Sequence, residues 1–227
     1  MKKRLVLSFL VLFAFNVSAQ EFMPGFNMFS HKKPAYITLN DGSKVEGELD
    51  KLNRKRNNIS GIRMIIDGQE IEYAPEDVKE MYLPAHSLNK FSLKIDNATN
   101  TSKDYDLDMI NEGYGYFENT EVILGKNNET LMMQLVNPSF ASKVRVYFDP
   151  MAMETASMSV GPMKTGGVDR SYFIKVGDEP AYKVSKGNYP KIYKDLYASC
   201  PSLIKEIGKK PNWKEIAEHM YAYDACE

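Results

Sequence analysis

The stretch "YITLNDGSKVEGELD", residues 36–50, has the pattern of an antiparallel hairpin. Ile37 and Leu39 alternate with more polar residues, as in a half-buried strand. The dipeptide Asp41-Gly42 follows, and it favours a tight hairpin turn because glycine adopts a positive φ at little cost. Gly47 lies in the middle of the returning strand, which predicts a sharp bend or a close approach of another backbone segment.

The residues that follow extend this hairpin into a small barrel. A second turn dipeptide, Asp67-Gly68, separates the strand-like runs "ISGIRMIID" and "QEIEYAP", and "PEDVKEMYLP" predicts a helical turn that leads into a last strand. Four or five short strands in such a short stretch are typical of an SH3-like or Sm-like barrel. We therefore expect a small β-barrel over residues 36–84, preceded by a flexible lead over residues 20–35.

The remainder of the chain divides by the spacing of its apolar residues. Residues 90–185 contain short strand-like runs separated by polar turns, which predicts an antiparallel β-rich domain. Residues 186–227 change to helical spacing, and Pro190 suits the first turn of a helix. The expected fold class is α+β, mostly β, with a helical C-terminal cap.

The first residues have the order of a secretory signal peptide. Lys2, Lys3 and Arg4 precede the apolar run "LVLSFLVLFAF" and the small-residue site "NVSAQ". We expect cleavage after residue 19 and no transmembrane segment in the mature chain. The protein is then expected in the periplasm, at the outer-membrane periphery or outside the cell.

The two cysteines, Cys200 and Cys226, both lie near the C-terminus. An even pair of cysteines in an exported protein predicts a disulfide, which would clasp the helical cap. A reactive thiol and a metal pair are the alternatives, but the chain has no Cys-x-x-Cys spacing that would favour them.

The charge balance argues against nucleic-acid binding. Of the 29 Lys and Arg residues, three lie in the signal peptide, which leaves 26 against 30 Asp and Glu. The stretch 36–50 resembles the start of an Sm barrel, whose Asp-x-hydrophobic-Asn group holds an RNA base. Here Asp50-Lys51-Leu52-Asn53 follows Gly47 too closely for that role.

The basic loop with Lys51, Arg54, Lys55 and Arg56 is interpreted as a solvated loop, or else as a contact for an anion or a lipid headgroup.

Several groups of residues could carry chemistry, and each also has a simpler structural interpretation. "DYDLDM" (Asp104, Asp106, Asp108) resembles the start of a calcium loop, but strand alternation explains it better. The methionines Met151, Met153, Met158 and Met163 could bind Cu(I) or fill a core. Glu112, Glu118 and Glu121 could supply an acid/base pair. The histidines His31, His86 and His219 fall in three different units. The Asn-x-Ser/Thr sites begin at Asn58, Asn97, Asn100 and Asn128.

The order of these elements resembles a family of uncharacterised secreted proteins of Bacteroidetes type. The elements that carry the resemblance are "NDGSKVEG", "EYAPEDV", "MMQLVNPSF", "KVRVYFDP", "NYPKIYKDLYASCPSL" and "HMYAYDAC". The resemblance implies an envelope location and supports the two cysteine positions. It implies no activity and no site residues.

The expected function is a non-enzymatic binding or scaffold module of the cell envelope, whose partner is a protein or a glycan. The expectation rests on the lack of catalytic motifs and on the many aromatic and methionine residues. The alternatives are a small hydrolase that acts on envelope polymers and a Met-rich copper-handling protein. We expect no cofactor and no nucleic-acid partner.

Overall fold

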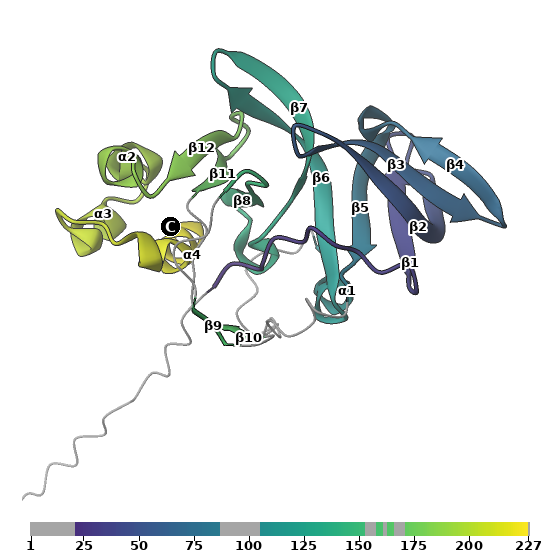
Figure 1. Ribbon diagram of the computed structural model, residues 1–227. Coiled ribbons are helices and arrows are strands. Elements are labelled where there is room, and N and C mark those ends of the chain that lie inside the picture. Colours follow the sequence, from purple (N-terminus) through teal and green to yellow (C-terminus); the bar gives the residue numbers. More distant parts are fainter. Residues whose placement is uncertain (1–20, 87–104, 153–157, 161–162, 166–170, 227) are drawn as a thin grey trace, which may run out of the picture.

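The computed structural model describes residues 21–86, 105–152, 158–160, 163–165 and 171–226 (Figure 1). Within this part of the chain, the largest element is an antiparallel sheet with the strand order β4-β3-β2-β1-β5-β6-β7. Its strands are β1 (Pro34–Leu39), β2 (Lys44–Lys55), β3 (Asn58–Ile66), β4 (Gln69–Tyr73), β5 (Val78–Pro84), β6 (Tyr114–Leu124) and β7 (Asn127–Gln134).

A smaller antiparallel sheet, β12-β11-β8, lies beside the large one and carries the C-terminal helices (Figure 1). Its strands are β8 (Val144–Phe148), β11 (Ser171–Val176) and β12 (Tyr182–Ser185), and β9 (Met158–Val160) pairs with β10 (Met163–Thr165) in a hairpin. The helices are α1 (Leu107–Asn111), α2 (Tyr189–Leu196), α3 (Pro201–Ile207) and α4 (Ile216–Asp224), with 3-10 turns η1 (Pro75–Asp77), η4 (Pro138–Phe140) and η5 (Trp213–Glu215). The prediction of a mostly β chain with a small helical C-terminus is confirmed.

Strands β1 to β5 follow the order expected for the small barrel, but they do not close on themselves. β1 pairs with both β2 and β5, and η1 lies between β4 and β5, as the "PEDVKEMYLP" pattern predicts. The other edge of β5 pairs with β6 rather than with β4. The sheet therefore continues from residues 36–84 into the region that was expected to form a separate β-rich domain.

Gly47 has the close backbone approach that the sequence predicts. A Cβ atom at this position would lie 2.7 Å from the backbone oxygen of Ile65 and 2.8 Å from Cγ1 of Ile66. β2 also shifts its register with β3 between Leu49 and Lys51. A long strand that bends in this way brings its two ends into different parts of the sheet.

We expect Gly47→Ala to lower the free energy of unfolding by about 2 kcal/mol, because the added methyl group must displace backbone rather than a mobile side chain. Urea unfolding measures the change. Gly187→Ala is the matched control, because the nearest atom to its Cβ is Ser185 Oγ at 3.9 Å. Equal stabilities of the two variants would contradict the close approach.

The N-terminal segment 21–30 packs against the sheet, in contrast to the expected flexible lead. Met23 and Phe26 are buried, and Met23 N donates to Val136 O at 2.7 Å. The buried amide of Gln134 accepts from Phe26 N at 2.7 Å and donates to Pro24 O at 3.0 Å. These contacts fix the segment next to the end of β7.

The stretch around "DYDLDM" is a helix, so the prediction of a strand there is wrong. Asp106 caps α1 by accepting from Met109 N at 3.0 Å. Leu107 and Ile110 are buried on one side of the helix. Their i, i+3 spacing fits a helix as well as the alternation of Tyr105 and Leu107 fits a strand, and the aspartate cap decides between the two.

The core is continuous across both sheets and the helical cap. The same cluster of buried side chains includes Met81 of β5, Phe140 of η4 and Tyr189 of α2. β6 also pairs with the segment before β12, because Ile123 N donates to Ala181 O and Ala181 N donates to Glu121 O, both at 2.8 Å. None of the helices among the described residues is sufficiently long and apolar to cross a membrane.

Candidate functional site

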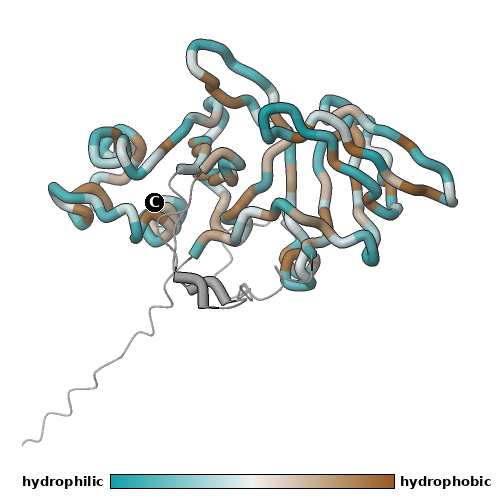
Figure 2. Tube along the Cα trace, viewed as in Figure 1, coloured by the Kyte–Doolittle hydropathy of each residue, from teal (hydrophilic) through white to brown (hydrophobic). Residues whose placement is uncertain are grey.

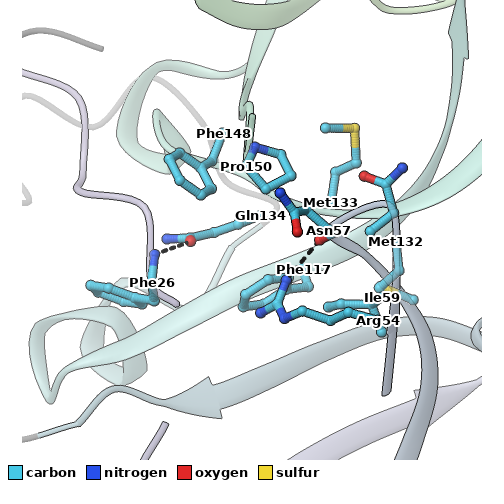
Figure 3. A pocket seen from close by; sticks show the side chains of 11 residues that line it. Phe26, Arg54, Asn57, Ile59, Phe117, Met132, Met133, Gln134, Phe148 and Pro150 are labelled. Carbon is cyan, nitrogen blue, oxygen red and sulfur yellow. Dashed lines mark hydrogen bonds between the residues drawn. The ribbon is translucent and has the colours of Figure 1, made fainter. Parts of the chain in front are cut away.

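A cleft opens where the tip of the hairpin β2–β3 approaches β7 and the end of β8 (Figure 3). It is small and open to solvent: its volume is about 20 Å³, room for about one water molecule, so it suits the tip of a single side chain or group of a larger partner. We call it the hairpin cleft. It is lined by Phe26, Arg54, Asn57, Asn58, Ile59, Phe117, Met132, Met133, Gln134, Phe148 and Pro150.

The floor of the hairpin cleft is apolar and its rim is polar. Ile59, Phe117 and Met132 are buried, whereas Arg54 and Asn57 are exposed at the hairpin. Arg54 Nη1 donates to Asn57 O at 3.0 Å, a bond visible in Figure 3. Arg54 is the only charged residue in the lining, so the site can combine apolar contact with attraction for a negative or polar group.

Two carboxylates, Glu80 on β5 and Glu118 on β6, are neighbours across the sheet. The hydroxyl of Tyr116 lies 3.0 Å from Glu80 Oε2 and 3.3 Å from Glu118 Oε2. Tyr147 of β8 donates to Glu118 Oε1 at 2.6 Å, and Arg145 Nε lies 4.0 Å from the same oxygen. The pair is therefore bound on several sides by the groups around it.

Burial, followed by the charge of Glu118, raises the pKa of Tyr116 and of Tyr147 far above its usual value. Burial also raises the pKa of Tyr82, which follows Glu80 by two residues on β5, to about 12. The hydroxyls of Tyr116 and Tyr147 stay protonated at physiological pH and donate to the carboxylates, whereas Tyr82 Oη accepts from Asp106 N at 2.9 Å. These hydrogen bonds stabilise the packing of β8 on the large sheet. Glu80 and Glu118 are also the two carboxylates that a hydrolytic mechanism would have to use.

His219 belongs to a hydrogen-bonded chain inside the helical cap. Its Nδ1 lies 2.6 Å from Tyr189 Oη, which in turn lies 3.0 Å from Tyr197 Oη. Its Nε2 lies 3.7 Å from Glu215 Oε2. Burial lowers the pKa of His219 although Glu215 and Glu206 raise it, so the neutral imidazole is favoured in the fold.

The buried, neutral His219 of this hydrogen-bonded chain predicts that the protein loses stability on acidification. Because folded His219 binds a proton less readily than the unfolded residue, its contribution is complete above the unfolded pKa of about 6.5 and declines as the pH falls towards its lower folded pKa. The measurement is urea unfolding of the protein and of His219→Gln over this pH range. We expect the stability difference between them to shrink with falling pH, and a constant difference would contradict the assignment.

The other residues singled out by the sequence do not converge. His31 Nδ1 lies 2.6 Å from Leu49 O on β2, far from His219 in the cap. Glu121 accepts from Asn128 Nδ2 at 2.8 Å, and the backbone oxygen of Glu112 accepts from Lys33. Among the described residues, no three His, Cys, Asp or Glu side chains are grouped as metal ligands.

The Sm-like residues serve the sheet itself. Asp50 forms a 2.6 Å ion pair with Arg63 of β3, and Asn53 donates to Glu72 of β4 at 2.9 Å. Asp50 thus links the neighbouring strands β2 and β3, and Asn53 reaches across β3 to β4.

The methionine group is only partly described. Met151 is 61% exposed, and its sulfur lies 2.8 Å from Asn57 Nδ2 at the rim of the hairpin cleft. Met158 and Met163 lie in the β9–β10 hairpin. Met153 lies outside the described residues, as do Asp104, Asn97 and Asn100. Sequence reasoning missed Met132 and Met133 of the cleft, because nothing in their strand pattern separates cleft positions from core positions.

Cys200 and Cys226 lie together in the cap, where their sulfur atoms are placed as a disulfide. Their Cα atoms are 6.1 Å apart, a separation that such a bond accommodates. Cys200 precedes α3 and Cys226 follows α4, as expected for a clasp between two helices.

Comparison of the chain with protein-family models, with curated proteins and with solved structures found no match.

Proposed function

We propose that the protein is a non-enzymatic binding or scaffold module of the cell envelope, and that a protein or glycan partner docks at the hairpin cleft. The signal-peptide pattern of the first residues supports the envelope location. The observation that carries the binding role is the cleft itself, in which an apolar floor opens beside the polar side chains of Arg54 and Asn57. Apolar sites with a few placed polar groups are the usual form of binding pockets.

The surroundings of Glu118 and of His219 support binding rather than hydrolysis. Glu118 is only 16% exposed, and both of its oxygens have tyrosine neighbours within 3.3 Å. Tyr189 and Tyr197, which flank His219, are fully buried. These groups are placed to hold elements together, whereas the hairpin cleft opens to solvent.

Asn58→Trp tests the proposal, because the large indole fills the cleft without changing the charge of the hairpin. Tagged wild-type protein is used to capture partners from native envelopes, which are identified by mass spectrometry. We expect a partner that is enriched by the wild type and lost with Asn58→Trp. The matched control is Ser60→Trp, at an exposed position of the same strand outside the cleft lining. If no partner is enriched, or if both variants retain it, the cleft is not the docking site.

The Glu80–Glu118 pair favours a second candidate, a small hydrolase that acts on envelope polymers. Glycoside hydrolysis by the retaining and by the inverting mechanism uses two carboxyl groups, one of which is protonated. Release of soluble fragments from purified envelope polymers by the wild type, and not by Glu118→Gln, would support this candidate over the first.

A further inference from the structure

The tip of the hairpin β2–β3 carries a concentrated positive charge. Residues 51–66 contain five Lys and Arg residues and no Asp or Glu. The turn itself consists of Arg56 and Asn57, with φ of 50° and 66°, so it reverses the chain within two residues. Lys51, Arg54, Lys55 and Arg56 are all exposed. In Figure 2 this tip is among the most hydrophilic parts of the chain.

The charges at the tip are not neutralised by the surrounding residues. Arg63, farther along β3, forms ion pairs with Asp50 at 2.6 Å and with Glu70 at 3.5 Å. In the part of the chain that the structure describes, no carboxylate is within ion-pair distance of Lys55 or Arg56. The tip therefore keeps a local positive field on a chain whose net charge is negative.

An exposed apolar side chain lies next to these charges. Met151 is 61% exposed, more than the other large hydrophobic residues described, and Asn57 Nδ2 contacts its sulfur at 2.8 Å. This contact joins the segment after β8 to the hairpin turn. An exposed basic turn with an exposed apolar side chain beside it has the composition of surfaces that bind the interface of anionic membranes.

We propose that the tip of the hairpin β2–β3, together with Met151, docks on an anionic phospholipid surface. Lys55 and Arg56 contact the headgroup phosphates, and Met151 enters the interface beside them. A membrane fits this surface better than a peptide does, because Lys55 and Arg56 are exposed at the turn and do not line the hairpin cleft. The inference rests on the envelope location of the proposed function but not on a partner in the hairpin cleft.

Sedimentation with lipid vesicles tests the inference. The mature protein is mixed with vesicles of phosphatidylcholine that contain phosphatidylglycerol, or with vesicles of phosphatidylcholine alone. We expect binding to the anionic vesicles only, with an affinity that falls as salt is added. The double variant Lys55→Gln/Arg56→Gln should bind about thirtyfold more weakly, because each basic side chain at an anionic surface contributes about fivefold.

Lys209→Gln/Lys210→Gln is the matched control, since it removes the same charge from an exposed turn after α3. It should keep the wild-type affinity. Met151→Ser should weaken binding while the dependence on salt remains. Equal binding to both kinds of vesicle, or equal losses in the two double variants, would overturn the inference. Competition by inorganic phosphate at the concentration of lipid phosphate would also overturn it, because it would show a site for a free anion. Asn58→Trp separates this proposal from docking at the cleft. It fills the cleft and leaves the charges of the tip unchanged, so it should abolish partner capture and keep vesicle binding.

Discussion

Replacing Cys200 and Cys226 together by serine is expected to lower the free energy of unfolding by about 3.5 kcal/mol, the largest effect of any change considered for this chain. The two residues are 26 positions apart, so their bond closes a loop of about 27 residues. The loop contains α3, η5 and α4, so the unfolded state that it restricts is that of most of the cap. Urea unfolding of the mature protein under oxidising conditions measures the loss.

A reducing agent provides the control for this prediction. Reductant should lower the stability of the wild type to that of the double serine variant, and it should leave the variant unchanged. If reductant has no effect on the wild type, the two thiols are not bonded in the purified protein. A large loss in the variant would then come from the packing of Cys200, which is 2% exposed.

Local patterns were enough to predict most elements of this fold. The strand-like runs expected within residues 90–185 include β6 (Tyr114–Leu124) and the two strands of the hairpin β11–β12. Asp67 and Gly68 adopt the positive φ that their turn requires. These successes depend on residues that are close in sequence, where the spacing of apolar side chains and the turn chemistry decide the conformation.

Pairing between distant elements could not be predicted in the same way. β5 ends 30 residues before β6 begins. Nothing in the sequence of either strand shows that β6 pairs with the second edge of β5, the edge that in a closed small barrel would pair with a strand of the same barrel. The packed N-terminal segment was missed for a related reason. Phe22, Phe26 and Phe29 suggest burial, but their partners, such as Gln134, lie more than a hundred residues away.

The candidate site depended on distant pairing as well. Arg54 was singled out as part of a basic loop, and its role at a cleft follows from the approach of Met132 and Phe148 from other strands. Glu118 was considered together with Glu112 and Glu121, whereas its carboxylate neighbour is Glu80. Proximity in sequence grouped Glu118 with Glu112 and Glu121, whereas the register of β5 and β6 places it opposite Glu80.

Asp224 is expected to be the second most sensitive residue, because its buried carboxylate joins the helical cap to the small sheet. It accepts from Ser142 Oγ at 2.8 Å, from Lys143 N at 2.6 Å and from Val144 N at 3.4 Å. Asp224→Ala removes this acceptor and leaves backbone N–H groups without it at the start of β8. Hydrogen bonds to a charged group contribute about 1.5–3 kcal/mol, so we expect a loss of about 3 kcal/mol.

Asp224→Asn is the matched control, because the amide oxygen can still accept from Lys143 N while the negative charge is removed. We expect it to cost about 1 kcal/mol, and Ser142→Ala, which removes a single neutral donor, to cost a similar amount. Urea unfolding at neutral pH compares the three variants, and amide exchange at Lys143 reports where protection is lost. If Asp224→Ala and Asp224→Asn are equally stable, the backbone bonds at β8 do not depend on this carboxylate. The cap is then held by its apolar contacts and by the cysteine pair.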